Sequence, residues 1–235
     1  MKFASFVSTA VATFVVSMAY VSPAQAALQA RDVGNTGSTN AFYDTTLNVT
    51  WYDVNSGGMS WENAKVWASS LNVGGTTGWR LPSMSGANLN PSYSYDGSTA
   101  WGHNVLGSSS EIASLFFDTL GNKSYYDTSG NADQAGWGLT NKGGFQNLQT
   151  TIYWLNAEFA PITSSAWGFV AGEGAQSPNL KSFQLYALAV HNGDVVAQVP
   201  EPESYVMLLA GLGLIGVVSR RRTTNPIAES GLPVS

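Results

Sequence analysis

Two apolar segments at the ends of the chain limit which residues can form a folded domain. Near the N-terminus, Lys2 precedes a largely apolar stretch at residues 3–20, and Ala24 and Ala26 then occupy the two small-residue positions of an A-x-A site. This pattern is typical of a secretory signal peptide and predicts cleavage after Ala26. The alternative is an uncleaved membrane anchor, which needs about 20 apolar residues and no peptidase site. We therefore assign residues 1–26 to a signal peptide.

The C-terminal end combines an extended motif with a short apolar run. Prolines remove backbone donors and favour an extended segment, which an enzyme can bind as a strand; the motif here is Pro200, Glu201 and Pro202. Residues 204–219 are uncharged, and at 1.5 Å per residue such a helix spans roughly 24 Å, less than a 30 Å hydrocarbon core unless the bilayer thins. We predict that residues 204–219 cross the membrane.

A basic cluster follows the apolar run and orients it; its members are Arg220, Arg221 and Arg222. By the positive-inside rule these arginines stay cytoplasmic, which leaves residues 27–199 outside. We call residues 27–199 the ectodomain.

The order of these three features resembles the PEP-CTERM sorting signal of Gram-negative bacteria, here residues 200–222. The resemblance implies recognition by an exosortase at an inner-membrane intermediate, removal of the tail, and delivery to the cell surface or the exopolysaccharide matrix. The family usually ends a few residues after the arginines, whereas this chain continues through a polar tail at residues 223–235. Retention of the tail as a membrane anchor is therefore the alternative.

The composition of the ectodomain predicts a folded, acidic domain. The chain contains 8 Trp, 10 Tyr and 10 Phe with 11% charged residues, whereas disordered chains are poor in aromatic residues. It has no cysteine and two histidines, which excludes disulfides and thiolate sites and argues against a histidine zinc site. Within the ectodomain six basic residues face twelve acidic ones, which argues against nucleic acid and against sulfated or phosphorylated polymers as partners.

Hydrophobic periodicity predicts two helices. Ser60 is a candidate N-cap for the first helix, and Gly74–Gly75 offer a left-handed stop. The second begins with a capping box of Ser108 and Glu111 and ends at Gly121. Its inward-facing positions are Ile112, Leu115, Phe116 and Leu120.

Strand patterns fill much of the remaining ectodomain. Apolar and polar residues alternate at residues 47–52 and 167–172, and residues 151–155 form a further candidate strand. Residues 183–190 are apolar on both faces and predict a central strand. We therefore expect one α+β domain with two helices and a mainly antiparallel sheet.

Three ectodomain segments, together bracketing residues 42–194, resemble the Lcl C-terminal domain family. The first runs from residue 47 to a box at residues 79–82, the second covers residues 110–116, and the third runs from residue 153 to residue 190. Many such proteins pair the box with a final Ala-Val-x-x-Gly-Asp-Val motif, here residues 189–195. The resemblance implies a C-type-lectin-like fold and, as in the adhesin that names the family, glycan binding. It implies no catalytic residues. This chain departs from the family at Gly78, commonly Asp, and at His191, commonly Arg.

The box at residues 79–82 is our structural candidate, and its members are Trp79, Arg80, Leu81 and Pro82. A guanidinium beside aromatic rings can stack on indole or bind a carboxylate. We favour a buried or half-buried ion pair of Arg80 that fixes the turn after the first helix, because buried charges are normally paired. Ligand binding by Arg80 is the alternative.

Two irregular stretches, residues 82–107 and 121–148, contain our candidate ligand residues. Both are too long for plain connections in a compact domain, so each is a functional loop or a disordered insertion. Indole faces stack on sugar rings, and Trp101 and Trp137 lie in these stretches in the company of Tyr93, Tyr95, Tyr125 and Tyr126. The alternative is that these rings only anchor the loops.

Catalytic and metal motifs are scarce. The sequence lacks G-x-S-x-G, H-E-x-x-H and G-x-x-x-x-G-K motifs, so we predict no catalytic residues, no metal and no cofactor. Residues 127–133 place oxygens at alternate positions, which leaves calcium open, although no bidentate Glu follows. A glycosidase pair also stays open, because it is defined by spatial separation; the carboxylates to test are Asp118, Glu158 and Glu173.

The sequence therefore favours an exported, non-enzymatic surface or matrix protein that binds extracellular polysaccharide. The two alternatives are a glycan-cleaving or glycan-modifying enzyme and a structural matrix component without a small ligand.

Overall fold

The computed structural model describes residues 28–85 and 90–195. The signal peptide, the sorting signal at residues 200–222 and the polar tail lie outside these residues, as does the predicted membrane span. Within the described part of the chain, no helix is both long and apolar enough to cross a bilayer.

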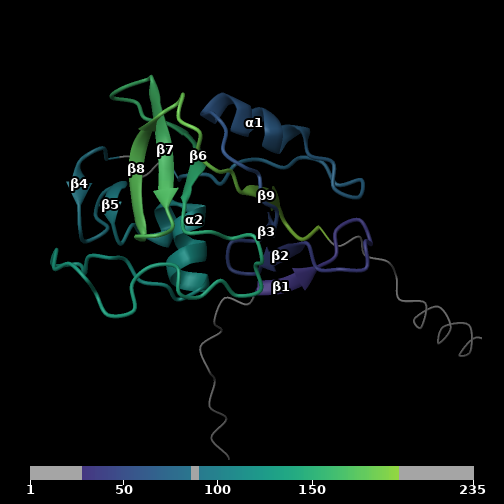
Figure 1. The fold of residues 1–235 in the computed structure, drawn as a ribbon, viewed down its shortest axis with the longest axis horizontal. Coiled ribbons are helices and arrows are strands. Elements are labelled where there is room, and N and C mark those ends of the chain that lie inside the picture. Colours follow the sequence, from purple (N-terminus) through teal and green to yellow (C-terminus); the bar gives the residue numbers. More distant parts are fainter. Residues whose placement is uncertain (1–27, 86–89, 196–235) are drawn as a thin grey trace, which may run out of the picture. The chain divides into compact units, whose positions relative to one another are not determined.

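The described residues form an α+β domain, as the sequence predicted, but its strands make two sheets where we expected one (Figure 1). The first sheet is antiparallel throughout, with the order β1-β2-β3-β9. Its strands are β1 (Leu28–Arg31), β2 (Ala41–Asp44), β3 (Val49–Tyr52) and β9 (Ala189–Asn192). The register places the start of β1 and the end of β9 at the same end of this sheet, because Leu28 pairs with Asp44, Asp44 with Val49 and Val49 with Asn192.

The second sheet has the order β4-β5-β8-β7-β6 and is antiparallel except between β4 and β5. Its strands are β4 (Tyr93–Ser94), β5 (Trp101–His103), β6 (Ile152–Glu158), β7 (Ser165–Val170) and β8 (Ala175–Leu180). Gly102 lets β4 and β5 approach closely, since its φ is +119° and an added Cβ would lie 1.9 Å from the Ser94 carbonyl oxygen. Thus one of the two irregular stretches supplies two strands of the sheet.

The first predicted helix is α1 (Trp61–Ser70), with Ser60 at the N-cap. The Ser60 side chain makes no capping hydrogen bond; the Trp61 N–H donates instead to the Lys181 carbonyl. The prediction that Gly74–Gly75 stop the helix was wrong. Leu71 already adopts an extended backbone, and the two glycines form the tight turn between Val73 and Thr76, whose backbones bond each other at 2.9 Å.

The second helical segment consists of η2 (Gly107–Ser109), α2 (Glu111–Ala113) and the π-helical η3 (Ser114–Thr119). The predicted capping box was wrong, because Ser110 is the N-cap and the Glu111 carboxylate bonds Arg80 instead. The stop at Gly121 is confirmed by its φ of +67° and by the Asn122 N–H bonding the Phe116 carbonyl. The four predicted inward residues, Ile112, Leu115, Phe116 and Leu120, are all buried.

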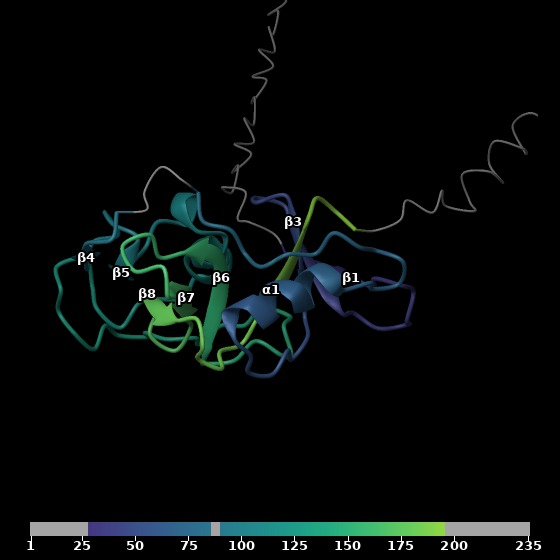
Figure 2. The ribbon, with the colours of Figure 1, turned by 90° about the horizontal axis from the view of Figure 1, so that it is seen from above.

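The helices pack on opposite sides of the β-structure, and strand alternation explains why. In β6, Tyr153 and Leu155 belong to the core cluster that contains α2 and η3, whereas Trp154 between them belongs to the cluster that contains α1. Successive strand residues point to opposite faces, so one strand serves both cores. Figure 2 shows α1 crossing the region between β6 and the first sheet.

The run at residues 183–190 is not a central strand, which corrects the prediction. Leu185 pairs with Met59, and Tyr186 pairs in parallel with Tyr153 of the second sheet. The chain then enters the first sheet as β9 at Ala189. The run is apolar on both faces because it passes between the two sheets, where both sides are covered.

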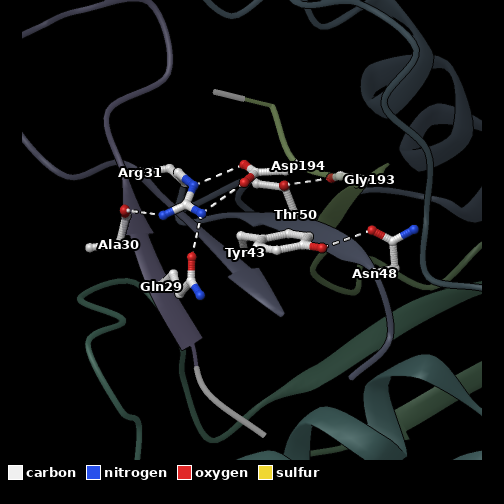
Figure 3. Close-up of polar contacts among 8 residues, drawn as sticks. All are labelled: Gln29, Ala30, Arg31, Tyr43, Asn48, Thr50, Gly193 and Asp194. Atoms are coloured by element: carbon white, nitrogen blue, oxygen red, sulfur yellow. Dashed lines mark hydrogen bonds and ion pairs between the residues drawn. The ribbon is translucent and has the colours of Figure 1, made fainter. Parts of the chain in front are cut away.

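A surface ion pair joins the two ends of the described domain (Figure 3). The Arg31 guanidinium donates to both carboxylate oxygens of Asp194 at 2.8 Å, and it lies 5.3 Å from the Tyr43 ring centroid. The Thr50 hydroxyl donates to the Gly193 carbonyl, which holds the chain that leaves β9 over the sheet face. β1 is thereby tied to the segment that follows β9.

Candidate functional site

The box at residues 79–82 connects the two sheets. Arg80 exchanges two backbone hydrogen bonds with Val190 of β9, and the Asn156 N–H of β6 donates to the Pro82 carbonyl. The side chains of Trp79 and Leu81 are buried. These contacts give the box a structural position between the sheets.

The Arg80 side chain forms a half-buried, two-pronged ion pair. Its Nη1 and Nη2 donate to the two Glu111 carboxylate oxygens at 2.7 and 2.8 Å, and Nη2 also donates to Asn192 Oδ1 at 2.6 Å. The Ser83 N–H donates to the same carboxylate at 2.7 Å. The guanidinium is thus engaged within the fold, which leaves it few donors for a ligand.

Positions 78 and 191, where the chain departs from the Lcl pattern, are neighbours. A Cβ added to Gly78 would lie 3.8 Å from His191 Nε2, and the His191 ring lies 5.5 Å from the Trp79 ring. His191 Nδ1 is buried and has no hydrogen-bond partner among the described residues. An Asp and an Arg at these two positions would therefore be adjacent.

Trp101 and Trp137, the two candidate ligand residues, stand at the ends of one chain of aromatic rings. The ring centroids follow one another at 6.0, 5.2, 4.9, 4.9 and 4.7 Å. We call this set the aromatic belt, and its members in order are Trp101, Tyr93, Tyr95, Tyr126, Tyr125 and Trp137. The belt joins β4, β5 and the loop of residues 121–148, which are far apart in sequence.

The belt presents part of its ring surface to solvent. Tyr93 is 47% exposed, and Tyr95 and Trp137 are each 37% exposed. Trp101, Tyr125 and Tyr126 are half-buried beneath them or between them. Successive rings of the belt meet edge to face or tilted, and such exposed apolar patches mark interaction sites.

Polar contacts fix the loops that bear these rings. Asn104 donates through Nδ2 to the carbonyls of both Tyr95 and Tyr126, at 2.7 and 3.0 Å. Gly130 packs against the Tyr95 ring, where an added Cβ would lie 3.1 Å from a ring carbon. Trp137 Nε1 donates to Asp133 Oδ1 at 2.8 Å. The belt is thus held by its own loops without a ligand.

A buried histidine supports the belt from below. His103 is stacked on Tyr95, with centroids 5.9 Å apart and planes inclined by 14°, and it also contacts Tyr93 and Tyr126. His103 Nδ1 lies 2.7 Å from Ser124 Oγ, and that hydroxyl contacts the carbonyls of Glu173 and Gly174. Burial lowers the pKa of His103, and the charge of Glu173 partly opposes this shift.

The Ser124–His103 contact resembles a nucleophile–base pair only in its distance. Ser124 is fully buried, and its single hydroxyl proton serves the backbone carbonyls of Glu173 and Gly174, so the hydroxyl accepts from the histidine. A nucleophile needs to donate toward its base and to reach substrate. The pair therefore has a packing role in this geometry.

An apolar groove adjoins the belt at Trp101. It encloses about 570 Å³ and lies beside β7 and β8. Its lining residues are Pro91, Trp101, Phe159, Pro161, Ile162, Ser165, Pro178, Asn179, Leu180 and Phe183. Asn179 bonds Ser177 within its own strand, so polar groups that could bind a sugar are few in the groove.

Within the loop at residues 127–133, the Asp127 carboxylate accepts its hydrogen bonds from neighbouring residues of the same loop. The Asp127 carboxylate accepts from the backbone of Ser129 and from the backbone and side chain of Asn131, all at 2.9 Å. These hydrogen bonds lower the pKa of Asp127. Residues 28–85 and 90–195 contain no cluster of three or more acidic or histidine side chains that could hold a metal ion.

The three carboxylates singled out for glycoside hydrolysis lie on different elements. Glu158 pairs with Lys181, Asp118 lies on η3, and Glu173 lies in the turn after β7. Glu158 pairs with Ala166 at one end of the β6–β7 ladder, while Glu173 lies beyond Val170 at the other. Four strand residues alone separate these ends by roughly 13 Å, more than a glycosidase pair needs.

Comparison with known proteins defines an exported protein that carries a C-terminal sorting signal. The family model described as the PEP-CTERM protein-sorting motif matches residues 198–222. The match supports processing by an exosortase and a membrane-anchored intermediate before surface display. No curated protein and no solved structure matches the chain. The resemblance of residues 42–194 to the Lcl and C-type-lectin-like families remains a prediction.

Sequence reasoning identified the belt residues one by one but missed their connection. It gave His103 no role and considered Glu173 only for a glycosidase pair, since an isolated histidine and a turn carboxylate carry no motif that places them beside the belt. The one available signal was the density of Tyr and Trp in two stretches that lack periodicity.

Proposed function

We propose that this protein binds extracellular polysaccharide through the aromatic belt after delivery to the cell surface or the exopolysaccharide matrix of a Gram-negative bacterium. The observation that carries the proposal is the unbroken row of partly exposed rings from Trp101 to Trp137.

The chemistry of the belt suits a sugar polymer. The C–H faces of sugar rings are apolar and pack on aromatic rings by the same forces that pack protein cores, while phenol hydroxyls and indole N–H groups bond the sugar hydroxyls. A row of rings in contact can engage several successive sugar units. The pre-formed loops also reduce the ordering cost of binding.

The direct test measures binding of the full chain, purified in mild detergent, to dextran, cellulose, chitin and exopolysaccharide isolated from a producing strain. We expect at least one polymer to bind the native chain. We expect Trp137→Ala to weaken that binding about tenfold, which corresponds to roughly 1.4 kcal/mol.

Phe183→Ala is the matched control, because Phe183 is a 49% exposed aromatic residue that lines the groove outside the belt. A loss of binding in Phe183→Ala with none in Trp137→Ala would assign binding to the groove and contradict the proposal. Absence of binding to all four polymers would contradict the proposal and favour a structural matrix component.

A further inference from the structure

Four carboxylates surround the aromatic belt. Asp96 directly follows Tyr95, and Asp127 directly follows Tyr126. Asp133 accepts the indole hydrogen bond of Trp137. Glu173 belongs to the turn whose carbonyl accepts the Tyr125 N–H, and its side chain is exposed. Each belt segment outside β5 therefore has an acidic neighbour.

Two of these groups, Asp96 and Asp127, keep their negative charge down to a lower pH than an ordinary aspartate does. Hydrogen bonds from Ser98 lower the pKa of Asp96, and hydrogen bonds from Asn131 lower the pKa of Asp127. Burial is the main cause of the raised pKa of Tyr93 and of the lowered pKa of His103; the negative charge of Glu173 adds to the first shift and opposes the second.

One cation lies near this acidic surface. Lys123 Nζ is 3.5 Å from the carbonyl of Ala135, two residues before Trp137. Within residues 28–85 and 90–195, the four carboxylates named above outnumber this lysine and make the field beside the belt negative, and at physiological salt such a field extends about 8 Å.

We propose that the belt selects polysaccharides by charge: it accepts neutral and amine-bearing polymers and rejects polyanionic ones. This inference rests on the proposed function and adds the class of polymer. Stacking on the rings supplies attraction to any sugar face, whereas the surrounding carboxylates repel uronate, sulfate and phosphate groups that would be held beside them.

Dextran provides a matched set of probes, because one backbone is available neutral, as anionic dextran sulfate and as cationic diethylaminoethyl-dextran. We expect the immobilised full chain to bind the cationic polymer most tightly, dextran less tightly and dextran sulfate least. The differences in affinity among the three polymers should shrink as the salt concentration rises, because salt screens surface charges.

The double variant Asp96→Asn and Glu173→Gln tests whether the belt carboxylates cause the selection. Both side chains are exposed, and an asparagine at position 96 can still accept the Ser98 N–H. We expect affinity for dextran sulfate to rise about threefold or more, affinity for the cationic polymer to fall similarly, and dextran to be unaffected.

The control variant Glu62→Gln with Asp32→Asn changes the net charge equally on α1 and in the loop after β1 of the first sheet, outside the elements that bear the belt. Equal effects of the two double variants would overturn the inference, because net charge alone would then explain the ranking. Dextran sulfate binding as tightly as dextran would also overturn it and leave glycan binding intact. Failure of all three polymers and of the four polymers above would instead remove the proposed function itself.

Discussion

The tryptophans around α1 and those of the aromatic belt differ in how their indole N–H groups are satisfied. Trp61, Trp79 and Trp154 are buried, and each donates to a backbone carbonyl of the fold, that of Leu155, Thr76 and Met59 respectively. In the belt, Trp137 donates to an exposed loop carboxylate. Trp51 differs from both groups, since it is buried without an N–H partner among the described residues.

This difference teaches that the number of tryptophans does not reveal their roles. A ring whose N–H is held by the backbone inside a core contributes to stability, and its loss leaves both a cavity and an unpaired carbonyl. A ring held by a loop at the surface contributes little to stability and keeps one face open. Substitution of a core tryptophan should therefore lower the unfolding free energy, whereas substitution of a belt tryptophan should weaken polysaccharide binding.

The largest effect is expected for Trp154→Ala. The side chain is fully buried between α1 and the second sheet, so the variant should lose about 3–5 kcal/mol of unfolding free energy. Urea denaturation monitored by circular dichroism would measure the loss. A loss below about 1 kcal/mol would show that this core repacks easily and would weaken the comparison.

Arg80→Ala should destabilise the domain by about 1–3 kcal/mol, because the half-buried Glu111 carboxylate would lose its two charged hydrogen bonds from Arg80 and retain only the Ser83 N–H. Arg80→Lys should recover only part of this, since lysine cannot bind a carboxylate with two prongs. The same denaturation experiment applies. Lys65→Ala is the surface control, because its ion pair with Glu62 is exposed, and its loss should stay below about 1 kcal/mol.

Trp137→Ala should change the unfolding free energy by less than about 1 kcal/mol, although it removes as large a side chain as Trp154→Ala does. Its ring is partly exposed and contacts Tyr125 and Asp133 on its own loop. Paired denaturation and polysaccharide-binding measurements would check this. A stability loss comparable to that of Trp154→Ala would make the belt a structural anchor and not a binding surface.

The smallest expected effect is the change in unfolding free energy with pH that arises from His103. Its folded pKa lies below the ordinary value of 6.5 because of burial, so the unfolded chain binds the proton more tightly. The contribution of His103 to stability is therefore complete above about pH 6.5 and declines as the pH falls through the folded pKa. We expect a lower unfolding free energy at pH 5 than at pH 7.5.

His103→Gln should remove this decline, since glutamine does not titrate and can still bond Ser124. Denaturation at the two pH values would measure both proteins. The carboxylates with lowered pKa, Asp32, Asp96 and Asp127, do not interfere, because their stabilising contributions are lost only below their ordinary pKa of 3.8. An unchanged pH dependence in the variant would contradict the role assigned to His103.

Local sequence patterns predicted elements better than connections. The presence of the first helix and the inward residues of the second helix were predicted correctly, because periodic burial is a local property. The capping-box prediction was wrong because the Glu111 carboxylate accepts hydrogen bonds from Arg80, 31 residues away. The prediction that residues 183–190 form a central strand was wrong, because burial on both sides arises equally inside one sheet and between two sheets.

The sequence by itself determined the class of the protein and the contents of its core. The sorting signal is linear, so an enzyme that binds an extended motif can recognise it without a fold, and the aromatic content required a packed domain. Only the tertiary structure decided that rings separated by up to 44 positions, Tyr93 and Trp137 among them, form one belt bordered by carboxylates. Such contacts depend on how loops close in space, and no local pattern of residues records that closure.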